Sequence, residues 1–329
     1  MKVLLVAPAW VGDMVMAHSL VQVLLTRHAD VEIDVVAPAA TVPLAERMPG
    51  VATRALLEIG HGELALGRRR ALGRALAGDG YDQAIVLPNT FKSALVPWWA
   101  GIPLRTGWQG ESRFAVLNDR RRLDADRYPL MIERFMALGL PAGADLPTPY
   151  PTPRLSVDEA NRQRLQEELE LDTDGGVLAL CPGAEFGPAK RWPAAHYAAV
   201  ARDAAAGGRR VWLFGSPGER AACAGIAALA PDAINLAGRT RLLDAVDLLS
   251  LAEVVVSNDS GLMHVAGAVG TRVVAVFGST SPAFTPPLGA AAQVVRVDVP
   301  CGPCFQRSCP LGHRRCLEEL GPERVIGLL

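Results

Sequence analysis

Short apolar runs alternate with longer amphipathic stretches along the first half of the chain. Three of these runs are KVLLVAP (residues 2–8), EIDVVAP (32–38) and YDQAIVLP (81–88), and a helical pattern follows each. Unbroken apolar runs, rather than strict alternation of apolar and polar residues, are typical of strands buried on both faces of a parallel sheet. The pattern therefore predicts an α/β fold with helices on both faces of the sheet.

The second half repeats this rhythm with GVLALCPG (176–183), RRVWLFGS (209–216), EVVVSND (253–259) and RVVAVFGS (272–279). Each run ends in small or polar residues, at the point where a strand would lead into a helix. In a doubly wound sheet, ligands bind outside the carboxyl ends of the strands. We expect these terminal residues to gather in one crevice.

A proline-rich segment separates the two halves. LPTPYPTPRL (146–155) has four prolines in ten residues, a composition that favours extended backbone and marks a domain boundary. We expect an N-terminal domain over residues 1–150 and a C-terminal domain over 151–329, two Rossmann-like doubly wound parallel-sheet domains facing a central cleft. Ser156 and Glu159 have the spacing of a capping box, which predicts a helix from there to about Leu169.

Length and composition agree with two well-packed domains. The chain has 329 residues, which suits two cores of about 150 residues each, and half of its residues are hydrophobic. Its formal net charge is -1, which argues against a protein that binds nucleic acid by broad phosphate neutralisation.

Nothing in the sequence predicts export or a membrane span. Asp13 interrupts the apolar run near the N-terminus, so this run differs from a signal peptide. The charge-free stretch from Val273 to Val295 contains three prolines, which is typical of a strand and a loop. We therefore expect a cytoplasmic protein.

Two common nucleotide-binding motifs are missing. Neither PAWVGD (8–13) nor CPGAEFG (181–187) supplies the Gly-x-Gly-x-x-Gly of a nicotinamide site, and no Walker A pattern occurs. These absences argue against an ordinary dehydrogenase or P-loop enzyme.

SNDSGLMHVAGA (257–268) is a candidate anion site, because a strand there runs into a helix. Three backbone N–H groups at the start of that helix would be free to bind a phosphate, those of Ser260, Gly261 and Leu262. Asp259 would be repelled by a phosphate, so we expect it to bind sugar hydroxyl groups or to cap the helix. His264, one turn further on, is either a ligand or a satisfied buried histidine.

Lysine is rare in this chain, since of 33 basic residues only Lys2, Lys92 and Lys190 are lysine. Lys190 stands in CPGAEFGPAKRWP (181–193), where its ammonium could neutralise a diphosphate or could simply be solvated. Glu219 follows the next strand along the chain. It could accept hydrogen bonds from ribose hydroxyl groups, or it could lie in the first turn of a helix.

Five segments in consistent order resemble the lipopolysaccharide ADP-heptosyltransferases (glycosyltransferase family 9), and heptosyltransferase II most closely: GDMVM, CPGAEFGPAKRWP, NDSGLMHVAGA, GSTSPAFTPPL and CGPCFQRSCPLGHRRCL. The resemblance covers nearly the whole chain. It implies a GT-B fold, with an ADP-heptose donor held by the C-terminal domain and a lipid-linked core sugar bound by the N-terminal domain. The implied reaction adds heptose to the first heptose of the inner core, on heptosyl-Kdo2-lipid A, without a cofactor or a catalytic metal.

The resemblance also implies roles for single residues. Lys190 would contact the donor phosphates, Glu219 would bind the ribose, and Asp13 would be the catalytic base. The heptose and diphosphate pocket would be lined by Asp259, Ser260, Gly261 and His264. Asp13 would deprotonate the acceptor hydroxyl as it attacks the anomeric carbon, ADP would leave from the opposite face, and the configuration would invert.

Asp13 itself stands alone among the apolar residues of VLLVAPAWVGDMVM (3–16). Partial desolvation in an apolar loop would raise its pKa and make it a better proton acceptor. From the residues alone, a second interpretation has equal weight: Asp13 only caps a helix that starts at Met14.

Basic residues of the first half are candidates for binding the anionic glycolipid acceptor. Lys92, Arg105 and Arg113 could bind its phosphates. The runs Arg68–Arg70 and Arg120–Arg122 are either solvated surface or contacts to the inner membrane, where we expect peripheral binding at the cytoplasmic face.

Two aromatic residues in the same half have two interpretations. Trp98 and Trp99 could belong to a membrane-facing apolar patch or to the core. We expect them in the core.

Four of the six cysteines, Cys301, Cys304, Cys309 and Cys316, fall within 16 residues. The first two have metal-ligand spacing, whereas the last two are further apart than in a zinc ribbon. A cytoplasmic setting disfavours disulfides. The cluster is therefore either a structural metal site or a set of reduced thiols that pack a loop.

Three other functions stay open at this point. The same fold could act on another acceptor, as heptosyltransferases I and III do. The chain could bind a nucleotide sugar without turnover, although the presence of both Asp13 and Lys190 argues against that. The cysteine cluster could instead make it a metal or redox module with bound zinc or reactive thiols.

Overall fold

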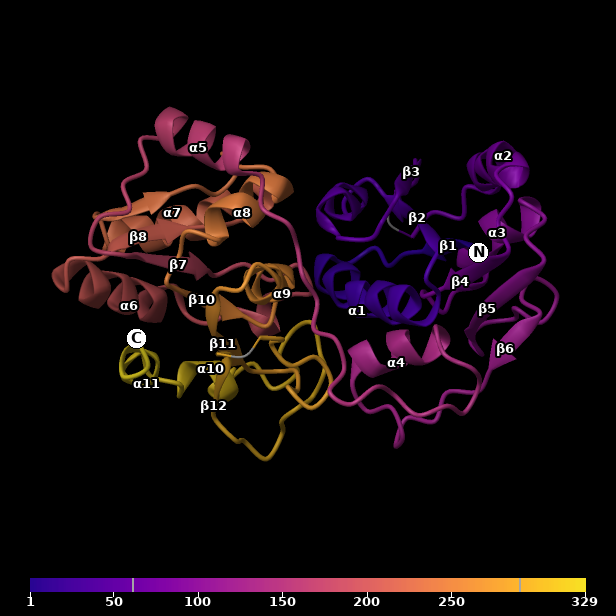
Figure 1. Ribbon diagram of the computed structural model, residues 1–329. Helices are drawn as coiled ribbons and strands as arrows, with labels where there is room; N and C mark the ends of the chain where they lie inside the picture. Colours follow the sequence, from indigo (N-terminus) through magenta and orange to yellow (C-terminus); the bar gives the residue numbers. More distant parts are fainter. Residues whose placement is uncertain (61, 290) are drawn as a thin grey trace. The chain divides into compact units, whose positions relative to one another are not determined.

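The computed structural model describes residues 1–60, 62–289 and 291–329. It divides into two compact units, Met1–Pro153 and Arg154–Leu329 (Figure 1). Each unit is built on one parallel sheet flanked by helices. The predicted α/β fold of two Rossmann-like sheets is therefore confirmed.

The sheet of the first unit has six described strands in the order β3-β2-β1-β4-β5-β6, and all neighbours pair in parallel. The strands are β1 (Lys2–Val6), β2 (Glu32–Pro38), β3 (Thr53–Leu57), β4 (Gln83–Val86), β5 (Leu104–Trp108) and β6 (Asp119–Arg121). The helices are α1 (Val11–Arg27), α2 (Leu66–Ala75), α3 (Leu95–Trp99) and α4 (Met131–Leu138).

The second unit has a parallel sheet in the order β12-β11-β10-β7-β8-β9. The strands are β7 (Val177–Cys181), β8 (Arg210–Leu213), β9 (Ala233–Asn235), β10 (Val254–Asn258), β11 (Arg272–Phe277) and β12 (Gln293–Arg296). The helices are α5 (Glu159–Glu168), α6 (Ala194–Ala206), α7 (Arg220–Leu229), α8 (Leu242–Leu249), α9 (Gly261–Ala268), α10 (Arg315–Glu318) and α11 (Glu323–Ile326).

Both units have the same strand order. When the strands of each unit are counted from its own start, both sheets run 3-2-1-4-5-6. The direction of winding reverses between the first and fourth strands, which are β1 and β4 in the first unit and β7 and β10 in the second. Ligands of doubly wound sheets bind outside the carboxyl ends of the strands at such a switch point.

All seven apolar runs of the sequence form strands, and all seven are interior strands of the two sheets. The structure adds β3, β5, β6, β9 and β12, which the apolar pattern did not predict. All of these except β5 lie at a sheet edge. Residues of β3, β6 and β12 are mostly exposed or half-buried, so an unbroken apolar run is absent there.

Two helices begin at residues other than those expected. α1 starts at Val11 after the N-cap residue Trp10, so Asp13 lies in the first helical turn and does not cap a helix at Met14. The capping box expected at Ser156 is also wrong. Asp158 takes the cap position of α5, and its side chain accepts a hydrogen bond from the N–H of the third helical residue at 3.0 Å.

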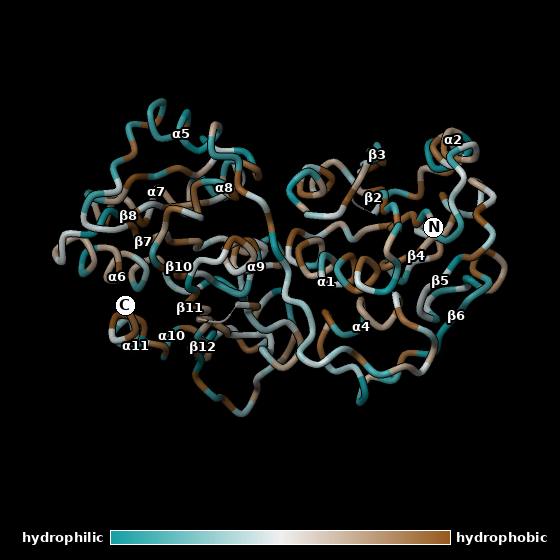
Figure 2. The backbone as a smooth tube through the Cα atoms, in the orientation of Figure 1, coloured by the Kyte–Doolittle hydropathy of each residue, from teal (hydrophilic) through white to brown (hydrophobic). Residues whose placement is uncertain are grey.

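Helix α5 buries little apolar surface. Of its ten residues only Leu165 is buried, and Figure 2 shows the helix as hydrophilic along most of its length. Apolar packing therefore contributes little to holding this helix on the second unit.

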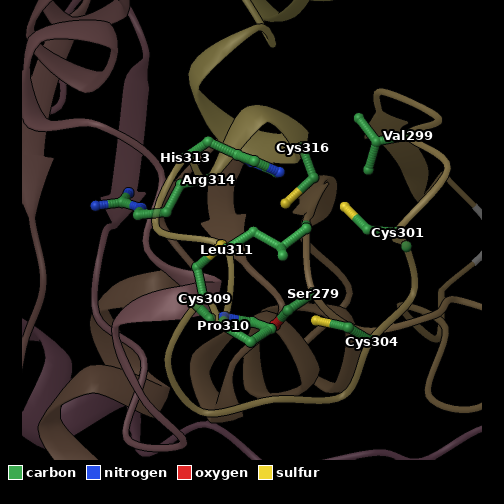
Figure 3. Close-up of a pocket in the computed structure, with 13 residues that line it drawn as sticks. Ser279, Val299, Cys301, Cys304, Cys309, Pro310, Leu311, His313, Arg314 and Cys316 are labelled. Atoms are coloured by element: carbon green, nitrogen blue, oxygen red, sulfur yellow. The ribbon is translucent and has the colours of Figure 1, made fainter.

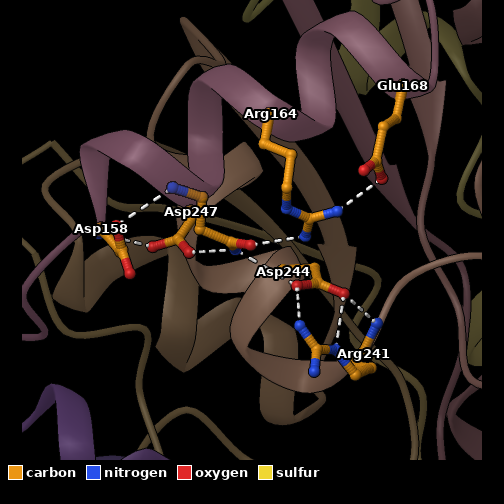
Figure 4. Close-up of polar contacts among 7 residues, drawn as sticks. Asp158, Arg164, Glu168, Arg241, Asp244 and Asp247 are labelled. Carbon is orange, nitrogen blue, oxygen red and sulfur yellow. Dashed lines mark hydrogen bonds and ion pairs between the residues drawn. The ribbon is translucent and has the colours of Figure 1, made fainter.

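A polar network joins α5 to α8 instead (Figure 4). Asn161 Nδ2 donates hydrogen bonds to Asp247 Oδ2 at 2.7 Å and to Asp244 Oδ1 at 3.2 Å. The N–H of Asp158 donates to Asp247 Oδ1 at 2.8 Å. Burial opposes ionisation of Asp244, but hydrogen bonds from Arg241 and the amide outweigh it and hold the pKa of Asp244 below its ordinary value. The two buried carboxylates thus depend on donors from α5 and its cap.

Replacing the amide donor should weaken the second unit. We expect Asn161→Ala to lower the free energy of unfolding by about 2 kcal/mol, because two buried carboxylates lose a hydrogen bond. Urea unfolding followed by circular dichroism measures this change. Glu168→Ala, which removes an exposed ion pair with Arg164 on the same helix, is the control and should cost about 0.5 kcal/mol or less. Equal losses in the two variants would contradict the prediction.

Candidate functional site

A lysine and a carboxylate meet at the switch point of the second unit. Lys190 ends a short 3-10 turn in the loop after β7, and Asp259 directly follows β10, the neighbouring strand. Lys190 Nζ donates to Asp259 Oδ2 at 2.6 Å. The Thr280 hydroxyl, which follows β11, donates to the same oxygen at 2.6 Å. The side chains of Lys190 and Asp259 are only 13% and 5% exposed, so the pair is largely shielded from water.

Asn258, the last residue of β10, holds the lysine loop in place. Its Oδ1 accepts hydrogen bonds from the N–H of Trp192 at 3.1 Å and from the Tyr197 hydroxyl at 3.0 Å. Its Nδ2 donates to the carbonyl of Pro182 at 2.6 Å. Neither Asn258 nor Thr280 was predicted from the sequence, although each stands where an apolar run ends.

An aromatic side chain lies beside the ammonium. Lys190 Nζ lies 5.0 Å from the centroid of the Phe186 ring, and the Arg307 guanidinium lies 5.5 Å from it. Cations near an aromatic face are stabilised by its quadrupole. Lys190 therefore has fixed neighbours on more than one side, which differs from a freely solvated loop lysine.

The N-terminus of α9 lies next to this pair. Ser260 is its N-cap residue, and within the described chain its side chain makes no capping hydrogen bond. Because Ser260 holds the N-cap position, the interpretation of Asp259 as the cap of this helix is wrong. Ser260 and Gly261 are half-buried, and the N–H groups of the first turn have no partners within the helix. The dipole of the helix adds positive potential there, so this N-terminus and Lys190 together favour an anion.

His264 lies inside the core below this helix start. It is 4% exposed, and its Nδ1 has no hydrogen-bond partner among the described residues. Burial is the main cause that lowers the pKa of His264 to about 4, although the Asp259 carboxylate opposes the shift. At neutral pH the imidazole is therefore uncharged. A buried nitrogen without a partner is a group that a ligand hydroxyl could satisfy.

Glu219 lies at the carboxyl end of the same sheet. Its Oε2 accepts a hydrogen bond from the N–H of Ser216 at 2.8 Å, so it has the local helix-start role that was one of its two interpretations. Its carboxylate also lies against Gly183, where an added Cβ would come within 2.0 Å of Oε1. The second carboxylate oxygen therefore borders the loop that carries Lys190.

In the first unit, Asp13 lies near the corresponding switch point. It occupies the first turn of α1, the helix that follows β1, and is half-buried. This turn lies at the positive end of the helix dipole. An ionised carboxylate is the form that can accept a proton.

The three cations expected to bind acceptor phosphates are directed mainly to the protein backbone. Lys92 Nζ donates to the carbonyl of Gly62 at 2.7 Å, and Arg105 Nε donates to the carbonyl of Val116 at 2.8 Å. Arg113 is 2% exposed, donates to main-chain carbonyls, and has its pKa lowered by burial. These contacts give Arg113 a structural role and count against a phosphate-binding one.

Two other surface expectations need correction. Arg69, in the first arginine run, is 3% exposed and donates to the carbonyls of Leu64 and Lys92, so that run is not all solvated surface. Trp98 is 44% exposed, so it lies outside the core in which it was expected.

Two absences concern membranes and metals. No helix among the described residues is long and apolar enough to cross a membrane. In the same part of the chain, no three His, Cys, Asp or Glu side chains are grouped so that they could hold a metal ion. The six cysteines are free thiols.

Two Rossmann-like units, one of which brings a lysine and a helix N-terminus together at its switch point, are typical of GT-B glycosyltransferases that use nucleotide sugars. The profile of glycosyltransferase family 9 (heptosyltransferase) matches residues 69–314. The chain belongs to this family, as the sequence motifs had indicated.

Individual relatives agree with this membership. The chain is 44% identical to lipopolysaccharide heptosyltransferase 2 of Salmonella typhimurium and 45% identical to that of Escherichia coli, and each match covers 99% of this chain and 97% of the relative. It is also similar to the solved ADP-heptose lps heptosyltransferase II of E. coli, with a TM-score of 0.90 and 43% identity over 99% of this chain and 97% of that one.

The lowered pKa of His264 predicts an acid-dependent stability. Between about pH 4 and pH 6.5 the unfolded chain binds more protons at this residue than the folded chain. The free energy of unfolding should therefore fall as the pH is lowered through this range, and His264 should account for a loss of up to about 3 kcal/mol. Above about pH 6.5 the residue is neutral in both states, and this loss should be absent.

His264→Gln should remove this part of the pH dependence, and urea unfolding of both proteins at the two ends of the range measures it. His313→Gln, at an exposed histidine of the same unit, is the control. If the free energies of unfolding of wild type and His264→Gln differ by the same amount at both pH values, His264 does not cause the pH dependence.

Proposed function

We propose that this heptosyltransferase transfers heptose from ADP-L-glycero-D-manno-heptose to the first heptose of the lipopolysaccharide inner core, on heptosyl-Kdo2-lipid A, with inversion at the anomeric carbon. The near full-length similarity to proteins named heptosyltransferase 2 supports this acceptor. The observation that carries the proposal is the Lys190–Asp259 pair beside the start of α9.

We infer that the second unit (Arg154–Leu329) binds the donor. The N–H groups of Ser260 and Gly261 and the Lys190 ammonium would bind the diphosphate, since all three present positive charge to one place. Asp259 keeps one carboxylate oxygen for Lys190 and Thr280, and its other oxygen could accept a hydrogen bond from a heptose hydroxyl.

The remaining donor contacts follow from burial. His264 Nδ1, neutral and without a partner among the described residues, suits a sugar hydroxyl. The Glu219 carboxylate, which borders the Lys190 loop, suits the paired hydroxyl groups of ribose.

In the proposed reaction, Asp13 accepts the proton of the acceptor hydroxyl while that oxygen attacks the anomeric carbon of the donor. The bond between that carbon and the diphosphate oxygen breaks, and ADP leaves from the opposite face. Negative charge grows on the departing phosphate, where the Lys190 ammonium stabilises it. The reaction needs no redox step and no cofactor.

We infer that the enzyme acts at the cytoplasmic face of the inner membrane through peripheral contact. Arg120 and Arg122 are exposed, and they suit an anionic lipid surface. The aromatic side chains of Trp98 and Phe114, 44% and 70% exposed, suit the interface between lipid and water. Among the acceptor-phosphate candidates, half-buried Lys92 remains the best placed.

Asp13→Asn should retain donor binding but lose roughly two to four orders of magnitude in the rate of ADP release, because the amide cannot accept the proton. The assay measures acceptor-dependent ADP release from ADP-heptose with heptosyl-Kdo2-lipid A. Asp79→Asn, at an exposed carboxylate of the same unit, is the control.

Each result of this assay bears on a different part of the proposal. If wild type releases no ADP with this acceptor, the acceptor assignment fails. Full activity in Asp13→Asn would show that this residue is not the base.

Lys190→Gln should weaken ADP binding by roughly 10- to 100-fold, because a charge-assisted hydrogen bond to phosphate is lost. Isothermal titration with ADP measures the dissociation constant. Lys2→Gln is the matched control, since Lys2 is engaged with Glu32 and Asp34 in the first unit. Unchanged ADP affinity in Lys190→Gln would remove Lys190 from the donor site.

A further inference from the structure

Four thiols surround one small cavity of the second unit. Cys301, Cys304, Cys309 and Cys316 all line it, and Figure 3 labels them among the lining side chains. The cavity has a volume of ≈ 30 Å³, which is room for one or two water-sized molecules. We call these four residues the cysteine pocket.

Two further polar atoms of this cavity have unmet hydrogen bonds. Ser279 Oγ and Arg314 Nε are buried there without a partner in the part of the chain that the structure describes. Buried polar groups of proteins normally have a partner. A small polar molecule in the cavity would satisfy the Ser279 hydroxyl, whereas the Arg314 guanidinium extends away from the thiols (Figure 3).

The pocket contains one thiol that differs from the others in its surroundings. The backbone N–H groups of four consecutive residues, Leu311 to Arg314, lower the pKa of the Cys309 thiol, and that of Arg314 has the largest effect. Successive N–H groups of this kind stabilise an anion. Burial has the opposite effect on Cys316 and raises the pKa of its thiol. The surroundings therefore favour the thiolate of Cys309 more than that of Cys316.

The loop that carries these cysteines is attached to the proposed donor site. The N–H of Ala189 donates to the carbonyl of Arg307 at 3.0 Å, and the N–H of Phe305 donates to the carbonyl of Ser279 at 2.7 Å. Arg314 also donates to the carbonyl of Arg191. These bonds reach the residues on either side of Lys190 and the residue before Thr280.

We propose that the cysteine pocket is a site of reversible thiol oxidation in which Cys309 reacts first, with hydrogen peroxide as the oxidant. The Cys309 sulfur attacks one peroxide oxygen, the O–O bond breaks, and the hydroxide that leaves takes up a proton to form water. Sulfur is oxidised to the sulfenic acid, and peroxide is reduced.

A second pocket thiol then attacks the sulfenic sulfur. The S–S bond forms, the S–O bond breaks, and the hydroxide that leaves combines with the proton of the second thiol as water. Two thiols and one peroxide thus give one disulfide and two waters, and a dithiol reductant reverses the change.

The first test compares Cys309 with Cys301 in the folded wild-type protein. Cys301 is exposed and Cys309 is only half-exposed, so accessibility alone predicts faster alkylation of Cys301. Backbone stabilisation of the thiolate predicts the reverse order, by about 10-fold or more in iodoacetamide labelling followed by peptide mass spectrometry. Cys181 and Cys223, both buried, are internal controls that should stay unlabelled.

Peroxide treatment then tests the product. We expect a disulfide between Cys309 and one of the other three pocket thiols, absent in Cys309→Ser and removed by dithiothreitol. Faster labelling of Cys301, an intermolecular disulfide, or a sulfinic acid on Cys309 without a disulfide would each overturn the proposal. So would one tightly bound zinc per purified chain that protects all four thiols.

Oxidation should also weaken donor binding, and this consequence rests on the proposed function of Lys190. Drawing two sulfurs to bonding distance displaces the cysteine loop and, through Arg307 and Phe305, the segments around Lys190 and Thr280. We expect ADP affinity to fall about 5-fold or more on oxidation and to recover with reductant.

Mass spectrometry and ADP titration together distinguish a failure of the oxidation proposal from a failure of the proposed donor site. A disulfide with unchanged ADP affinity would overturn the coupling while leaving the oxidation site in place. If the reduced protein does not bind ADP, the proposed function fails, whereas the mass spectra still decide the oxidation chemistry.

Discussion

The ion pair between Lys190 and Asp259 is the interaction around which the site of the second unit is arranged. A carboxylate that is so little exposed is costly to keep ionised unless it has a cation and a hydrogen-bond donor, and Lys190 and Thr280 supply both. Because these residues follow β7, β10 and β11, the pair also fixes three strand ends relative to one another. The ammonium is therefore held in position before any ligand binds, which reduces the entropy lost on binding.

Several arginines of the first unit bind the backbone of the protein itself, although a run of positive charge suggests a surface that binds anions. Arg69, Arg105 and Arg113 each donate to two or more main-chain carbonyls. A planar guanidinium with five donors can join several carbonyls at once, which an ammonium does less well. These three guanidinium groups thus serve the structure of the unit itself and not the binding of an anionic substrate.

The sequence predicted the parts of the fold that depend on local pattern, such as the interior strand β10 and the helix start at Ser260. It missed edge strands such as β3, because an exposed strand carries no continuous apolar signal. It placed Asp259 and Lys190 in one site, yet it did not predict Asn258 and Thr280 as their supports. Those contacts join segments that are far apart in the chain, and no spacing rule within one segment reports them.

The two units share one strand order, and this allows their loops to diverge independently. In each unit the segment after the first strand carries a charged side chain, negative at Asp13 and positive at Lys190. One backbone plan therefore accommodates opposite charges in the segments that follow corresponding strands, because the strand order does not determine which side chains those segments carry. The loops of one unit can then diverge and change which substrate that unit binds, while the other unit still binds its own ligand.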